Sequence, residues 1–146
     1  MNPLLLRALE HVHGHLGWLA ALSLLHPAVS LRRTSRRALL SAWFGTALVS
    51  ATGLLSALIY PAYRSGIKPH LFATVPAIGL AFERKEHLGI GAIALAWAGL
   101  GLHWAASQGT GPRPSARLAH LAYVGAAAMA LLSAALGTLV AVERSF

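Results

Sequence analysis

The sequence predicts an all-α integral membrane protein, a bundle of four helices that cross the bilayer up, down, up and down. Of its 146 residues, 56% are hydrophobic and only 11% are charged, a composition outside the range of soluble domains. The charges are also segregated. No Asp, Glu, Lys or Arg occurs between Glu10 and Arg32, between Arg37 and Arg64, between Glu86 and Arg113, or between Arg117 and Glu143. Each gap exceeds the roughly 20 apolar residues that cross a hydrocarbon core.

We therefore predict a single domain, residues 1–146, with spans at about residues 5–29, 38–59, 86–107 and 116–142. Tyr60-Pro61 is expected to end the second span. A helix that begins near Pro76 is expected to become the third span, and the Gly- and Pro-rich residues 108–114 to form a turn. The first span is interpreted as a membrane helix rather than a signal peptide, because an arginine cluster follows it directly.

Hairpin connectivity assigns each connection to one membrane face. Face A receives the N-terminus, the connection of residues 60–85 and the C-terminus, and face B receives the other two turns. All four acidic residues fall on face A: Glu10, Glu83, Glu86 and Glu143. The arginines directly after the first span predict that face B is cytoplasmic, so both termini lie outside what we expect to be a bacterial inner membrane.

Composition also excludes several functions. The net charge of +8 comes from basic residues beside the spans, a placement that suits anionic lipid headgroups and argues against nucleic acid as a partner. Without cysteine, the chain forms no disulfide, iron–sulfur cluster or covalently attached haem. Without Asp, it has no Ser-His-Asp triad. Nothing in the sequence supports catalysis by the chain alone.

Eight histidines point to a function. They lie in the first span (His11, His13, His15, His26), the connection (His70), the third span (His87, His103) and the fourth (His120). Ionisable side chains in a bilayer are costly and suggest a functional site, and imidazole commonly binds haem iron and transition metals. On a helix, His11, His15 and His26 share a stripe with Trp18 and Leu22. We expect this stripe to face the bundle interior and His13 to face the opposite side.

One histidine pair near each face resembles the arrangement in small four-helix membrane b-type cytochromes. The resemblance implies one or two non-covalent b-type haems and electron transfer with a quinol or another redox partner. It assigns the face A iron to His15 or His11 with His87, and the face B iron to His120 with His103 or His26. The implied propionate partners are Arg7, Arg64, Lys68, Arg84 and Lys85 on face A, and Arg32, Arg33, Arg36, Arg113 and Arg117 on face B. The second span supplies no ligand, which departs from this pattern.

The face A pair gives the sharpest expectation. We expect His15 and His87 to share one centre, because both lie near face A and the first and third spans would be neighbours in a compact bundle. Glu83 or Tyr60 would then orient the ligands.

Two alternatives stay open. In the first, His11, His15, Glu83 and His87 bind a transition-metal ion such as zinc, iron, copper or manganese, because i,i+4 spacing presents two ligands to one ion. In the second, the chain is a structural subunit of a larger membrane complex or a homo-oligomer, because the Ala- and Gly-rich fourth span favours a helical partner. The simplest interpretation of His70 and His13 is a polar residue at headgroup level. Four tryptophans are expected to mark the interfaces: Trp18, Trp43, Trp97 and Trp104.

Overall fold

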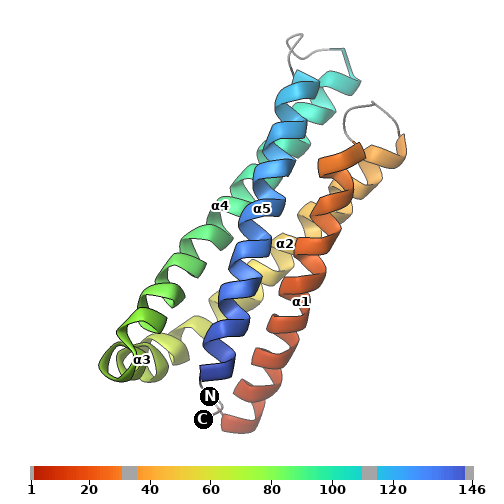
Figure 1. Cartoon of the computed structure of the whole chain (residues 1–146). Helices are drawn as coiled ribbons and strands as arrows, with labels where there is room; N and C mark the ends of the chain where they lie inside the picture. The colour runs from red at the N-terminus through yellow and green to blue at the C-terminus, as the bar shows by residue number, and fades with distance from the viewer. Residues whose placement is uncertain (1, 31–35, 110–114, 144–146) are drawn as a thin grey trace.

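The computed structural model describes residues 2–30, 36–109 and 115–143, and the described chain is helical almost throughout. Its elements are α1 (Pro3–Ser30), α2 (Arg36–Ala62), the π-helix η1 (Tyr63–Ile67), α3 (Lys68–Thr74), α4 (Pro76–Ser107) and α5 (Ser115–Glu143) (Figure 1). The predicted all-α class is confirmed, and each predicted span falls inside one long helix.

Three stretches of the described residues are long and apolar enough to cross a membrane: Arg37–Thr74, Pro76–Ser107 and Ser115–Val142. They contain the second, third and fourth predicted spans and support an integral membrane protein. The predicted first span forms α1, which has 28 residues but is not among these three stretches. Four of its residues are histidines, and each of them lowers the hydropathy of the helix.

The four long helices lie side by side (Figure 1). Close contacts join α1 to α2 and α5, and join α4 to the same two helices. Helices α1 and α4 therefore occupy opposite corners of the bundle, so the expectation that the first and third spans are neighbours is wrong. The start of α1, the end of α5 and the short α3 lie at one end, which we call the face A end, and the opposite end is the face B end.

Small side chains form most of the core. The buried cluster contains Leu24, Val49, Leu100 and Tyr123 among ten alanines, because alanine lets helix backbones approach closely. The Tyr123 hydroxyl lies 2.7 Å from Thr46 Oγ1 and donates to the carbonyl of Ala42 at 3.1 Å. This polar bridge joins α2 to α5 inside the core.

The orientation of α1 differs from the prediction. Its buried residues are Ala20, Ala21, Leu24, Pro27 and Ala28, and His13 is half-buried on the same side. The stripe expected to face inward is exposed: His11, His15, Trp18, Leu22 and His26. The physical reason is the size of the side chains on each side of α1. The alanine side lets α2 and α5 approach α1, whereas large side chains would hold them apart.

The connection between α2 and α4 is helical rather than an open turn. Pro61 lies inside the last turn of α2, and the chain continues through η1 into α3. Val75 then leaves helical geometry, with φ −138° and ψ 81°, and Pro76 begins α4 as predicted. We call this connection, residues 63–75, the elbow. A second buried cluster holds the elbow against the face A ends of α4 and α5, and it contains Leu71, Ile78, Phe82 and Val140.

Candidate functional site

Three ionisable side chains gather at the face A end of the bundle: His13 from α1, and Lys85 and Glu86 from α4. All three are half-buried. His13 Nδ1 and Glu86 Oε1 are buried atoms without a hydrogen-bond partner among the described residues. Lys85 lies within electrostatic range of both side chains. A buried polar atom without a partner is costly, so these groups mark a candidate site.

Lys85 is positioned by apolar surfaces. Its ammonium group lies 5.1 Å from the centroid of the Phe82 ring. A Cβ atom added to Gly137 would lie 3.5 Å from Lys85 Cδ and 4.0 Å from Nζ, an ordinary van der Waals contact, so the lysine side chain packs against α5 at Gly137. Ser133 fixes the backbone here by donating a hydrogen bond to the Lys85 carbonyl at 3.2 Å. Among the side chains that the structure describes, which do not include that of Glu143, Lys85 forms no ion pair.

The α1 and α2 helices hold His13. The main chain at Thr52 lies beside its ring. Thr52 Oγ1 donates to the carbonyl of Leu48 at 2.9 Å and reaches the carbonyl of Leu16 at 3.4 Å, which ties α2 to α1. One further bond ties α1 to α5, from Trp18 Nε1 to Thr138 Oγ1 at 3.1 Å.

A further pair of charged side chains lies beside the cluster, one from the elbow and one from α4. Lys68 Nζ lies 2.9 Å from Glu83 Oε1, so an ion pair joins α3 to α4. The Tyr63 ring stacks on Phe82 with centroids 5.5 Å apart and an interplanar angle of 13°. Glu86 lies within electrostatic range of Lys68 and Glu83 as well as Lys85. The elbow therefore borders the cluster at its solvent side.

The middle of the bundle separates this cluster from the face B end. Beyond the cluster the core contains mainly small apolar residues such as Ala20, Val49, Ala92 and Ala127, together with the buried Thr46–Tyr123 pair. On α4, this apolar layer extends from Gly89 to Ala96, about 10 Å along the helix axis at 1.5 Å per residue.

The predicted face A haem ligands are not brought together. His11, His15 and His87 are exposed on α1 and α4, at opposite corners of the bundle. His15 Nδ1 lies 2.8 Å from the carbonyl of His11, and His87 Nδ1 lies 2.8 Å from that of Glu83. Each ring is thus held by its own helix. The expected shared centre of His15 and His87 has no support in this arrangement.

The alternative metal site is not assembled either. Across the described residues, no group of three or more His, Cys, Asp or Glu side chains is close enough to hold a metal ion. Glu83 is paired with Lys68, and Tyr60, the other residue expected to orient the ligands, is half-buried near the elbow. His70 is exposed, and its interpretation as a polar residue at headgroup level stays a prediction.

The face B histidines have a different environment. His103 is 1% exposed and His120 is half-buried. The Nδ1 atom of each is buried without a partner in the described chain. His26 is exposed, with Nδ1 3.5 Å from Ser30 Oγ. Helices α4 and α5 touch nearby, where a Cβ on Gly99 would lie 2.8 Å from the Tyr123 ring. This packing leaves no slot for a porphyrin between the two helices.

The predicted propionate partners divide into three groups. Arg7, Arg64, Arg84 and Arg117 are exposed. Lys68 is paired with Glu83, and Lys85 turns toward the bundle. Arg32, Arg33, Arg113 and the side chain of Arg36 lie outside the described residues.

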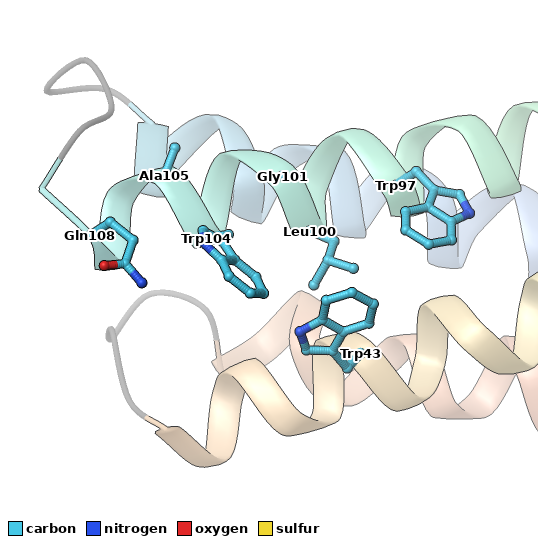
Figure 2. Close-up of a pocket in the computed structure, with 7 residues that line it drawn as sticks. All are labelled: Trp43, Trp97, Leu100, Gly101, Trp104, Ala105 and Gln108. Atoms are coloured by element: carbon cyan, nitrogen blue, oxygen red, sulfur yellow. The ribbon is translucent and has the colours of Figure 1, made fainter.

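A tryptophan-lined groove lies between α2 and α4 toward the face B end. Figure 2 shows its lining: Trp43, Trp97, Leu100, Gly101, Trp104, Ala105 and Gln108. Its volume is about 540 Å³. Trp43 meets the other two indoles edge to face, with centroids 6.2 Å from Trp97 and 6.0 Å from Trp104. No titratable side chain lines the groove, and its three indoles are exposed. The interfacial role of these tryptophans stays a prediction, and Trp97 lies in the middle of the predicted third span.

Sequence reasoning assigned His13 and Lys85 to the wrong environments. The usable signal for His13 was its position on the same helix face as Ala20, Ala21 and Leu24. For Lys85 and Glu86, it was their place at the start of a long apolar stretch, where any charge is exceptional.

Comparison of the chain with protein-family models, with curated proteins and with solved structures found no match. The case for a function therefore depends on the geometry of the cluster itself.

Proposed function

We propose that this chain is a proton-exchanging component of a membrane, and that Glu86, His13 and Lys85 form its working site. The observation that supports the proposal is that His13 Nδ1 and Glu86 Oε1 are buried and unpartnered in the described structure, with Lys85 within electrostatic range of each of the two side chains. Ionisable groups inside membrane helices commonly belong to proton relays or to ion and substrate pathways.

Proton exchange fits the chemistry of the three groups. A carboxyl oxygen without a partner is satisfied either by a proton or by a donated hydrogen bond, and imidazole both accepts and donates protons. The apolar layer between Gly89 and Ala96 separates the cluster from the other face. We therefore propose exchange with one membrane face, and not conduction across the bilayer.

The proposal includes a topology. In it, α1 joins the three apolar stretches as a fourth span, and the helices cross the membrane up, down, up and down. In this topology the four histidines of α1 lie toward the ends of that span or against the neighbouring helices. With the arginine-rich residues 32–37 in the cytoplasm, the cluster opens to the non-cytoplasmic side.

Infrared difference spectroscopy tests proton exchange at Glu86. Proteoliposomes are titrated with pH, and the carboxyl band that disappears in Glu86→Gln gives the titration midpoint of Glu86. We expect Lys85→Met to move this midpoint because Lys85 is within electrostatic range of Glu86, and His13→Asn to move it through Lys85, which is within range of His13.

Two neighbouring exposed residues provide matched controls for these variants. Arg84→Met removes a cation, and His11→Asn removes an imidazole, without touching the cluster. Both should leave the midpoint of Glu86 in place. An unchanged midpoint in Lys85→Met and in His13→Asn, or no band assignable to Glu86, rejects the proposal.

Haem binding at the face B end is a second proposal, in which His103 and His120 bind iron. It is supported by their buried Nδ1 atoms, which have no partner in the described structure. It requires α4 and α5 to separate near Gly99, because the two helices touch there. When bound, a haem would supply one-electron redox chemistry.

An absorption spectrum tests this second proposal. Protein expressed with excess haem should show a Soret band and a pyridine haemochrome, and His103→Ala should lose both. The absence of both signals from the wild-type protein rejects haem binding.

A further inference from the structure

We infer that His11 and His15 of α1 bind a transition-metal ion such as zinc together with the same two histidines of a second copy of this chain. The site lies at an interface and takes two imidazoles from each copy. It is separate from the cluster of His13, Lys85 and Glu86. The inference rests on the proposed topology, in which α1 spans the membrane, and does not depend on proton exchange.

The outer side of α1 carries a continuous seam of exposed residues. They are spaced alternately four and three apart, which is the spacing of the two core positions of a coiled coil. The opposite side of the helix, which includes the buried Ala20 and Pro27, packs against the bundle. Within the seam, Trp18 also reaches α5 through its bond to Thr138. We call these eight exposed residues the α1 seam: Leu4, Ala8, His11, His15, Trp18, Leu22, Leu25 and Val29.

A common topology dictates how two copies meet at this seam. If all copies insert in the same direction, a twofold axis along the membrane normal relates two of them, and their α1 helices are parallel. Each seam residue then lies opposite its own equivalent, in the left-handed packing that is common between membrane helices. His11 and His15 therefore meet the same residues of the other copy, and four imidazoles come together.

The two histidines have the arrangement of ligands on one helix. Their spacing of four residues places the Cβ atoms about 5–6 Å apart on one face, and helix-borne zinc sites use the same spacing. His15 Nδ1 lies 2.8 Å from the carbonyl oxygen of His11. Because a carbonyl only accepts, Nδ1 carries the proton and Nε2 of the neutral ring presents its lone pair. Metal-binding histidines generally hold their second ring nitrogen in this way.

One chain cannot complete the site by itself. Structural zinc sites usually have four protein ligands, and the described residues of one chain bring together no group of three or more potential ligands. A second copy supplies the missing pair. The Asp, Glu, Lys and Arg residues of α1 are Arg7 and Glu10 alone. Their opposite charges give the helix no net charge to oppose a metal cation.

Packing along the α1 seam is too small to hold two copies together without the metal. From Leu4 to Val29 the seam is about 38 Å long, and a helix is about 10 Å wide, so each copy presents about 400 Å². A stable interface usually buries about 800 Å² per partner. Metal coordination supplies the remaining stabilisation. We therefore expect the pair to form with zinc and to separate without it.

Zinc binding by untagged protein in a mild detergent tests the site. Protein stripped with EDTA is titrated with zinc against a chromophoric chelator, while light scattering follows the mass of the protein. We expect one zinc per two chains and a change from monomer to dimer. His11→Asn and His15→Asn should each weaken zinc binding by more than about tenfold, the lower limit for loss of an outer-shell partner of a metal.

Two exposed histidines provide matched controls. His26→Asn removes an imidazole from the same helix. His87→Asn removes one whose Nδ1 also lies 2.8 Å from a main-chain carbonyl, that of Glu83. Neither has a second histidine four residues away, so both variants should keep the zinc affinity of the wild type. No zinc binding, one zinc per single chain, or unchanged affinity in His11→Asn and His15→Asn overturns the inference.

Cross-linking in membranes tests which surface meets the second copy. In this cysteine-free chain, two leucines with nearly equal exposure are compared: Leu22 on the α1 seam, 54% exposed, and Leu132 on α5, 55% exposed. With zinc present, a short bis-maleimide should join two copies of Leu22→Cys protein and leave Leu132→Cys protein monomeric. Cross-linking of Leu132→Cys and not of Leu22→Cys overturns the inference.

The infrared titration of Glu86 in zinc-free buffer separates this inference from the proposed function. If Glu86 titrates with a midpoint that depends on Lys85 but zinc does not bind at His11 and His15, the interface site is rejected and proton exchange stands. If zinc joins two copies through His11 and His15 but no Glu86 titration is found, proton exchange is rejected and the metal site stands.

Discussion

Two glycines on α4 give a matched test of how closely this bundle is packed. A Cβ added to Gly99 would lie 2.8 Å and 2.9 Å from ring atoms of Tyr123 and 3.3 Å from the carbonyl oxygen of Ala119. Tyr123 cannot retreat easily, because it is fully buried and its hydroxyl is bonded to Thr46 and Ala42. A Cβ added to Gly101, two residues further along the same helix, would meet nothing within 4 Å.

The two Gly→Ala variants should therefore change stability in opposite directions. Both gain the helix propensity of alanine, worth up to about 1 kcal/mol, and this gain cancels when they are compared. The overpacking at Gly99 remains, at about 1–3 kcal/mol. We expect Gly99→Ala to be less stable than Gly101→Ala by this amount, with Gly101→Ala at least as stable as the wild type.

Reversible unfolding in mixed SDS and non-ionic detergent micelles, followed by circular dichroism, measures this difference. Gly14→Ala on α1 is a further control, because a Cβ there also meets nothing within 4 Å. Equal stability of the two α4 variants would refute the close contact between α4 and α5. It would also remove the packing argument against a porphyrin between these helices.

Three further predictions follow from the same structure. Tyr123→Phe should lower the free energy of unfolding by about 0.6 kcal/mol, the mean for hydrogen bonds between membrane helices, and by no more than about 1.7 kcal/mol. A double-mutant cycle with Thr46→Val should show coupling, and additive effects would exclude the bond. In this cysteine-free chain, the single substitutions Ser65→Cys and Gln108→Cys should be labelled by an impermeant maleimide from opposite membrane faces, and labelling from one face would refute the topology. Proteoliposomes under a potassium diffusion potential should show no proton flux above that of empty vesicles, because mainly small apolar side chains lie between the cluster and the face B end; a flux abolished by Glu86→Gln would show a conducting path instead.

The sequence by itself determined the number and type of the long helices. Segregation of charge, apolar length and helix-breaking residues are local properties, so the spans expected at residues 38–59 and 116–142 fall within α2 and α5, and the expected start of a helix near Pro76 is the start of α4. Local signals failed at Tyr60-Pro61, where the helix continues into η1. There the elbow is held by a contact distant in the chain, that of Leu71 and Phe82 with Val140.

Only the tertiary structure decided which histidines and charges lie together. The helical period of α1 correctly placed His13 on a different face from His11 and His15. Both faces of that helix carry apolar residues, so the sequence pattern did not say which face points into the bundle. Close approach of α2 and α5 to the alanine side of α1 settled the choice and brought His13 toward Lys85. The diagonal placement of α1 and α4 likewise kept His15 away from His87. Both outcomes depend on how closely helix backbones can approach, a property of facing pairs of helices that no single segment encodes.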